Sequence, residues 1–376
     1  MRSVLLPLRR NGIKLTYVLS AMLAVTAGWI TMQKVFGQTN AYVVTELSGE
    51  DASQVPSKLN NLGDIVGRAA SAAEGGTRAT IWNRSRSNSK HLGALSGGDY
   101  SSASDINDAG EVAGVSNTGK AIVPFVWTAT SGLRRIPLLP GDSCGQAIGI
   151  NKYGHIAGYS SGPNGARAFL WARKTGVRNL GVLPGGNYSR ARDLNDSDEV
   201  AGLSASSAGE RAVLWTKTGN VRDLGTLPGD WASEATAINN AGDVVGYSKG
   251  PRGMRAFLWT EGTGMQELGV LPGGDSSRAL DINDSGEVVG SSTSSSGDRA
   301  FIWTKQAGMI DLNSASSLRL GVVFFEAHAI NYKGEILVMG KVGHESSMSG
   351  ETASPEDQQC APAPPSSFLL TPAALK

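Results

Sequence analysis

The chain has 376 residues, 49 of them glycine, and a formal net charge of +1. This glycine share is about twice the usual one, and no long stretch beyond the N-terminus repeats apolar residues at i, i+3, i+4 and i+7, which excludes a mainly helical protein. Five basic and no acidic residues precede residue 38, so 29 basic and 33 acidic residues remain. A mildly acidic body excludes an electrostatic footprint for nucleic acid.

The N-terminal segment, residues 1–37, has the pattern of an export signal. Arg9, Arg10 and Lys14 precede an apolar stretch from Leu15 to Ile30, which is shorter than the roughly 20 residues that span a bilayer. We expect cleavage near Gly37; the alternative is an uncleaved anchor, which would be the protein's only membrane contact. Both alternatives place residues 38–376 outside the cytoplasm, in the periplasm, on the cell surface or in the medium.

Two residue types then recur with a period of 44 residues. The tryptophans are Trp82, Trp127, Trp171, Trp215, Trp259 and Trp303. The asparagines, each after Leu or Ile, are Asn60, Asn107, Asn151, Asn195, Asn239, Asn283 and Asn331. Internal repeats of this length are typical of solenoids and propellers.

One unit, from 277 to 312, predicts four short strands at 278–283, 287–291, 299–304 and 309–312. Four strands in about 44 residues are typical of a propeller blade. A glycine follows three residues after the asparagine in six units, as a tight turn with positive φ requires. The fourth unit has Asp198 there, a residue that tolerates this conformation better than most. The asparagine is expected to cap its own turn.

The tryptophans and the phenylalanines near them are predicted to lie in the core, because they stand mid-strand in successive repeats. The alternative is an exposed platform on which sugars stack. Alanines four residues before each of the last six asparagines suit an inner strand close to the propeller axis.

The seventh unit is split between the two ends of the chain. Its third strand is predicted at 367–371, with Leu370 in the tryptophan position, after an insertion at about 343–366 that we expect to be mobile. Its fourth strand is predicted at 42–47, near the N-terminus. The prediction is an all-β, seven-bladed β-propeller with four strands per blade, one domain over 38–376, whose last blade the N-terminal strand closes. A linear solenoid would need no such split.

The repeat resembles the HAF-type extracellular repeat family of bacterial exported proteins. The resemblance covers roughly residues 42–372 and depends on Leu-Pro-Gly-Gly at 183–186 and 271–274, on 282–290 (INDSGEVVG) and on 256–260 (AFLWT). Arginine replaces the eponymous histidine at Arg167, Arg255 and Arg299. The resemblance implies an extracytoplasmic repeat protein and no particular reaction.

The Leu-Pro-Gly-Gly loops follow the fourth strands and are predicted to form a ring on one face, around the mouth of the channel. Loops on a rigid scaffold commonly carry binding residues. The candidate ligand-binding residues are Tyr100, Asp142, Tyr188, Arg190, Asp230, Trp231, Asp275 and Arg278. Aromatic, carboxylate and amide groups suit a saccharide, peptide or protein ligand. The alternative is turn chemistry with an incidental polar surface.

Evidence for catalysis in the sequence is thin. The turns lack the alternating oxygen ligands of a calcium loop, and the four histidines form no metal-binding pair, so neither metal nor cofactor is predicted. A non-catalytic, monomeric binding scaffold is the first hypothesis. The alternatives are a glycan-acting hydrolase that uses Glu234 or Glu326 at the channel mouth, and a purely structural surface protein. Cys144 and Cys360 lie in loops predicted on the same face, where a disulfide is an open alternative in an oxidising compartment.

Overall fold

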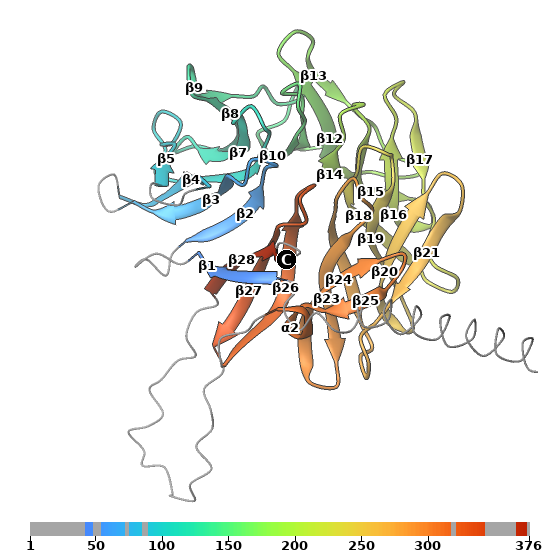
Figure 1. Ribbon diagram of the computed structural model, residues 1–376. Helices are drawn as coiled ribbons and strands as arrows, with labels where there is room; N and C mark the ends of the chain where they lie inside the picture. The colour runs from blue at the N-terminus through green and yellow to red at the C-terminus, as the bar shows by residue number, and fades with distance from the viewer. Residues whose placement is uncertain are drawn as a thin grey trace, which may run out of the picture.

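The computed structural model describes residues 42–47, 54–71, 75–84, 89–316, 321–342 and 366–373, so the predicted export segment and most of the predicted insertion lie outside the described residues. Seven four-stranded antiparallel sheets are arranged around one axis (Figure 1). The inner strands of neighbouring sheets contact one another around the whole ring, and the last contacts the first. The predicted seven-bladed β-propeller is therefore confirmed, and a linear solenoid is excluded.

Blades 1 to 6 each contain four consecutive strands, ordered from the axis outward. Blades 1 to 3 consist of β2 (Val55–Leu59), β3 (Ile65–Ala70), β4 (Thr77–Trp82) and β5 (Ser89–His91); β6 (Ser101–Ile106), β7 (Val112–Asn117), β8 (Ile122–Thr128) and β9 (Gly132–Arg135); and β10 (Cys144–Ile150), β11 (Ile156–Gly162), β12 (Gly165–Ala172) and β13 (Gly176–Asn179). Blades 4 to 6 consist of β14 (Ser189–Leu194), β15 (Val200–Ser206), β16 (Gly209–Trp215) and β17 (Val221–Asp223); β18 (Ala232–Ile238), β19 (Val244–Gly250), β20 (Gly253–Thr260) and β21 (Gly264–Gly269); and β22 (Ser277–Ile282), β23 (Val288–Ser294), β24 (Gly297–Thr304) and β25 (Gly308–Asp311).

Blade 7 joins the two ends of the described chain. Its order is β26 (Val322–Ile330), β27 (Ile336–Val342), β28 (Ser366–Pro372) and β1 (Tyr42–Glu46). Leu370 lies opposite Ile336, as Trp171 lies opposite Ile156 in blade 3, so Leu370 does occupy the tryptophan position. The predicted closure by the N-terminal strand is confirmed, and β1 covers an edge of β28 that would otherwise be open.

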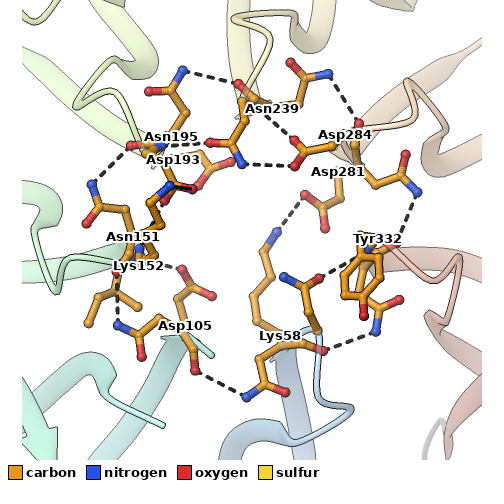
Figure 2. A pocket seen from close by; sticks show the side chains of 18 of the residues that line it. Lys58, Asp105, Asn151, Lys152, Asp193, Asn195, Asn239, Asp281, Asp284 and Tyr332 are labelled. Carbon is orange, nitrogen blue, oxygen red and sulfur yellow. Dashed lines mark hydrogen bonds and ion pairs between the residues drawn. The ribbon is translucent and has the colours of Figure 1, made fainter. Parts of the chain in front are cut away.

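The repeated asparagines perform two tasks, of which the sequence predicted one. In blade 5 the Asn239 Oδ1 accepts hydrogen bonds from the backbone N–H groups of Ala241 (3.0 Å) and Asp243 (2.9 Å), which confirms the predicted turn cap. Its Nδ2 also donates to the backbone oxygen of Asn283 in the next blade (3.3 Å). Each blade repeats this second bond, and Asn331 closes the circle on the Asn60 oxygen (3.1 Å). Seven buried amides thus bind the blades into a ring around the axis, part of which Figure 2 shows.

Asp198 has the predicted left-handed backbone conformation, with φ of 63°. Its carboxylate accepts a hydrogen bond from the Asn151 amide (3.0 Å) and contacts His155 Nδ1 (2.7 Å). A side chain in this position therefore adds a connection between blades 3 and 4 that a glycine cannot provide.

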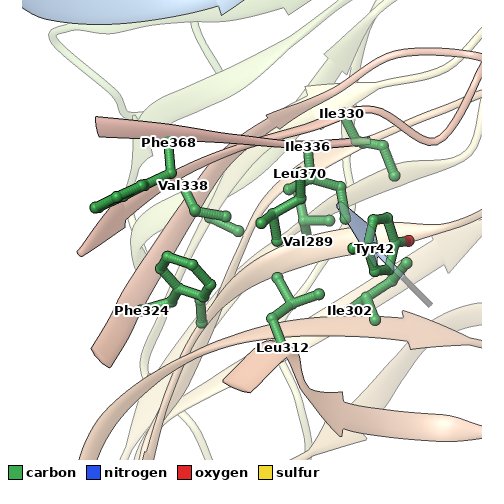
Figure 3. Close-up of a cluster of buried hydrophobic side chains, with 12 residues drawn as sticks. Tyr42, Val289, Ile302, Leu312, Phe324, Ile330, Ile336, Val338, Phe368 and Leu370 are labelled. Carbon is green, nitrogen blue, oxygen red and sulfur yellow. The ribbon is translucent and has the colours of Figure 1, made fainter. Parts of the chain in front are cut away.

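The core lies between the blades. Trp82, Trp127, Trp171, Trp215 and Trp259 are buried and Trp303 is half-buried, so the core placement of these residues is confirmed rather than the exposed platform. Between blades 6 and 7, the side chains of Val289, Leu312, Phe324 and Leu370 pack together, with Tyr42 of the closing strand among them (Figure 3). Burial of this strand's aromatic ring favours the closed propeller through the hydrophobic effect.

Two local features differ from the simple four-strand unit. After blade 6 the chain forms a short helix, α2 (Leu312–Ala315), because the Asp311 carboxylate caps the N–H group of Asn313 (2.9 Å). Every inner strand also contains a β-bulge two to four residues before its asparagine, such as the one between Ala279 and Asp281.

No helix within the described ranges is long and apolar enough to cross a membrane.

Candidate functional site

The two faces of the propeller differ in their backbone chemistry. Each inner strand begins near a loop from the preceding blade and ends at an asparagine turn. We name the first face the Pro-Gly-Gly face and the second the asparagine face. In the loop before blade 4, Gly186 N donates to Leu183 O (3.0 Å) and Gly185 has φ of 77°. Proline at the second and glycine at the third position define a type II turn, so the repeated loop sequence is explained by backbone geometry.

Each of the three predicted ligand-binding carboxylates ties its loop to the second strand of the blade that follows the loop. Asp142 accepts a hydrogen bond from the Ser160 hydroxyl. Asp230 accepts one from Ser248 (2.7 Å) and Asp275 one from Thr293 (2.9 Å). The structure thus gives Asp142, Asp230 and Asp275 a positioning role in the loops.

The mouth of the channel on the Pro-Gly-Gly face has lost the symmetry of the repeat. The inner-strand position five residues before the asparagine is equivalent in all blades. It holds Val55, Ser102, Gln146, Arg190, Glu234, Arg278 and Glu326 in blades 1 to 7. Blades 1 to 3 therefore present uncharged side chains at this mouth, and blades 4 to 7 present four charged ones.

Three of these charged groups lie in two separate ion-paired clusters, one around Glu234 and one around Glu326. Arg192 Nε lies 2.6 Å from Glu234, and the Tyr247 hydroxyl donates to the same carboxylate (2.6 Å). Arg278 lies 3.1 Å from Glu326. Burial raises the pKa of Tyr247, and the adjacent Glu234 adds to this effect. The phenol therefore stays protonated and keeps donating at physiological pH.

His328 joins the Glu326 cluster, with its Nε2 3.3 Å from the Glu326 carboxylate. Burial lowers the pKa of this histidine, and the positive charges of Lys58 and Arg278 act in the same direction, against the opposing effect of Glu326. A lowered pKa favours the neutral imidazole at pH 7.

Arg190 is the exposed cation of the mouth. Its guanidinium lies 5.3 Å from the centre of the Tyr159 ring, and it forms no ion pair within the described part of the chain. Tyr188 precedes it, and its hydroxyl donates to Glu210; burial, followed by this hydrogen bond, raises the pKa of Tyr188 to about 12. Arg190 thus keeps free N–H donors for a ligand.

The remaining predicted aromatics lie on the same face. Tyr100 is half-buried, whereas the side chain of Trp231 is 54% exposed. The Trp231 backbone oxygen accepts a hydrogen bond from Arg211 (2.8 Å), which fixes the loop while the indole remains in solvent. The structure therefore places all eight predicted residues on one face, where Arg190 and Trp231 are the exposed cation and the exposed aromatic side chain.

A second polar site, at the asparagine face, was not predicted. A cavity of about 260 Å³ there is lined by Lys58, Asp105, Asp193 and Asp281, together with the asparagine ring. Figure 2 shows Lys58 reaching Asp281, at 2.8 Å. The signal was present two residues before each asparagine, where aspartate alternates with glycine or alanine from blade 2 onward and blade 1 has lysine.

The carboxylates of this second site have internal partners. Asp105 accepts a hydrogen bond from Ile150 N, and Asp193 one from Ile238 N, so each joins its blade to the next. Burial raises the pKa of Asp105 to about 6 and that of Asp193 to about 7, although Lys58 opposes both shifts. These contacts favour a structural role for the buried charges.

Cys144 lies half-buried at the start of β10, and its Sγ is 3.8 Å from the backbone oxygen of Ser161. Cys360 lies outside the described residues, so the predicted disulfide stays a prediction. Within the described ranges, no group of three or more His, Cys, Asp or Glu side chains is placed to hold a metal ion.

No protein-family model and no curated protein matches this chain. Solved structures do match in fold. Oligogalacturonate lyase in complex with manganese has a TM-score of 0.56 and 13% identity, over 88% of this chain and 93% of that chain. Virginiamycin B lyase from Staphylococcus aureus has a TM-score of 0.54 and 11% identity, over 88% and 100%. A streptogramin B lyase has a TM-score of 0.52 and 13% identity, over 88% and 98%.

At these identities the likeness establishes the class of protein, a β-propeller built from repeated four-stranded blades. This fold hosts enzymes and binding proteins alike, so it assigns no activity.

Proposed function

We propose that this chain is an exported, non-catalytic binding protein that holds its ligand at the channel mouth of the Pro-Gly-Gly face, over blades 4 to 7. The observation that carries the proposal is the loss of repeat symmetry at one inner-strand position, where Arg190, Glu234, Arg278 and Glu326 replace uncharged residues. All seven blades have the same four-stranded arrangement, with or without a charged residue at this position, so the fold itself does not require these charges. Charged and aromatic groups gathered at one mouth are typical of a recognition site.

Two features support binding rather than catalysis. Glu234 and Glu326, the carboxylates that a hydrolase would use, each have a cationic partner within 3.1 Å. Charge-assisted pairs of this kind hold side chains in fixed positions. These fixed ion pairs are therefore suited to orienting a ligand.

Export is supported by the sequence before residue 38, with its basic residues and apolar stretch. The likeness to HAF-type extracellular repeats agrees with this location. Both export and cleavage can be tested by mass spectrometry of the protein recovered from the producing cell. Its mass is compared with the mass of residues 38–376.

A binding screen of the full-length protein against neutral and acidic oligosaccharides, peptidoglycan fragments and short peptides tests the proposal. We expect a ligand that binds without turnover and that Arg190→Ala and Trp231→Ala each weaken by about tenfold. Tyr153→Ala is the matched control, because Tyr153 is 60% exposed on the asparagine face; it should leave binding unchanged.

Two outcomes would contradict the proposal. Turnover of a saccharide that Glu234→Gln or Glu326→Gln abolishes would favour the hydrolase. Binding of nothing in the screen would favour a purely structural surface protein. The acidic oligosaccharides in the screen include oligogalacturonate, because one protein of similar fold is an oligogalacturonate lyase. This tests whether the two proteins share a ligand as well as a fold.

A further inference from the structure

A second cavity, of about 310 Å³, opens between blades 6 and 7 on the Pro-Gly-Gly face. Its volume lies at the lower end of the range for small-molecule sites, roughly 300–1,000 Å³. Its wall combines the apolar side chains of Met254 and Phe325, several hydroxyl groups and the Arg278–Glu326 ion pair. Apolar walls with a few convergent polar groups are typical of a ligand pocket.

The aromatic wall of this cavity is an insertion in blade 7 that no other blade shows within the described residues. In blade 6, Ser277 pairs with Ser292 and Arg278 with Ser291, without a residue between. In blade 7, Phe324 pairs with Gly340 and Glu326 with Met339, and Phe325 stands between them without a partner. This extra β-bulge accompanies the longer spacing of 48 residues from Asn283 to Asn331. Bulges commonly redirect a side chain beside a functional site.

The bulge divides two adjacent phenylalanines between different environments. Phe324 is fully buried in the core, whereas Phe325 is half-buried and lines the cavity. The ammonium group of Lys341, which does not line the cavity, lies 4.9 Å from the centre of the Phe325 ring. Phe325 thus contacts Lys341 and also lines the cavity.

Several polar groups of the cavity have no partner in the described part of the protein. The hydroxyls of Ser276 and Ser291 and the exposed carboxylate of Asp298 make no hydrogen bond or ion pair there. Other hydroxyls in the wall are already engaged: that of Ser277 accepts from Ala256 N (2.9 Å), and that of Ser292 from Leu271 N (3.0 Å). The free groups therefore remain for a ligand.

We infer that this cavity binds one neutral pyranose unit of a saccharide; the inference rests on the proposed binding function and names its ligand class. The apolar face of a pyranose packs against Phe325 and Met254. Its hydroxyls both donate and accept, so they match Asp298 as an acceptor and the Ser276 and Ser291 hydroxyls in either role. Arg278 and Glu326 neutralise each other, so Asp298 leaves the cavity with a net negative charge that disfavours uronic acids.

The test is titration of the full-length protein with chitotriose, cellotriose and trigalacturonate. Binding is measured by isothermal titration calorimetry and by saturation transfer from the protein to the sugar protons. We expect at least one of the neutral trisaccharides to bind, and trigalacturonate to bind at least fivefold more weakly. Phe325→Ala should weaken the neutral ligand about tenfold, and Asp298→Asn and Ser291→Ala about threefold each. Tyr153→Ala, on the opposite face, should change nothing.

The variants separate this inference from the proposed function. Phe325 and Asp298 are not fully buried, so their replacement leaves the core intact, which the thermal unfolding curve checks. Three results would overturn the inference. Neither neutral trisaccharide binds, trigalacturonate binds more tightly than they do, or Phe325→Ala and Asp298→Asn leave the affinity for the neutral ligand unchanged. Binding of any ligand that Arg190→Ala weakens, while Phe325→Ala does not, would preserve the proposed function and reject only this cavity.

Discussion

The replacement of Lys58 by methionine tests the electrostatic account of the channel. Lys58 Nζ lies 2.8 Å from Asp281, whose side chain is only 7% exposed, and its charge opposes the burial that raises the pKa of Asp105 and Asp193. Methionine keeps most of the length of the lysine side chain but removes its charge. Asp105, Asp193 and Asp281 then lose the lysine whose charge acts on all three.

The expected loss follows from the energy of an uncompensated buried charge. At an effective dielectric constant of 20, two unit charges 2.8 Å apart attract by about 6 kcal/mol. Removal of one partner from a buried pair commonly costs about 3–5 kcal/mol. We therefore expect Lys58→Met to lower the free energy of unfolding by about 3–5 kcal/mol at pH 8.

The loss should shrink as the pH falls. The pKa of Asp193 is about 7 and that of Asp105 about 6 in the folded protein, both above the unfolded value near 4. The folded state thus binds more protons between pH 4 and 7, and its stability increases as the pH falls through this range. Without Lys58 these pKa values rise further, so protonation removes the repulsion at a higher pH.

Urea unfolding followed by tryptophan fluorescence at pH 8 and pH 5 measures both effects. We expect the deficit at pH 5 to be less than half of that at pH 8, and the double variant Lys58→Met/Asp281→Asn to recover part of it. Lys305→Met, at an exposed position, is the control for the substitution itself. An equal deficit at the two pH values would refute the electrostatic reasoning and assign the loss to packing.

Three further predictions concern the scaffold. Asp193→Asn should flatten the dependence of stability on pH between 5 and 7, measured by urea unfolding, because it removes the carboxyl group with the highest of the two pKa values. Asn239→Ala should cost about 2–4 kcal/mol, measured in the same way, since it removes two turn hydrogen bonds and the bond to Asn283 from a buried site; a loss below 1 kcal/mol would contradict the ring. Removal of residues 1–47 deletes β1 and exposes β28, so we expect a lower melting temperature and association on size-exclusion chromatography.

The sequence predicted the fold almost completely because the repeat fixes local structure. A four-strand unit, a glycine turn and a buried tryptophan depend on residues within about 44 positions of one another. The split seventh blade was also predictable, because its last unit lacked a third and a fourth strand. The segments that contain Leu370 and Tyr42 match these two strands of the repeat. Pattern and backbone geometry agree at every level in these elements.

Contacts between blades were less predictable. The bond from each asparagine to the next depends on the angle between blades, which no single repeat encodes. The pairing of Lys58 with Asp281 joins residues of blades 1 and 6, which the curvature of the ring brings together across the channel. A side-chain contact of this kind becomes visible only once the propeller is closed.

The same repetition separates scaffold from site. A residue type that fills one position in nearly every blade, such as the turn asparagine, is explained by a bond that every blade makes. At the mouth position Val55, Ser102 and Gln146 show that the backbone accepts uncharged side chains, yet Arg190 and Arg278 are charged. Phe325 is an extra inner-strand residue that the other blades lack within the described ranges. Because blades without the charges or the insertion have the same four-stranded sheet, these departures, rather than the repeated residues, are the positions on which the proposed ligand recognition depends.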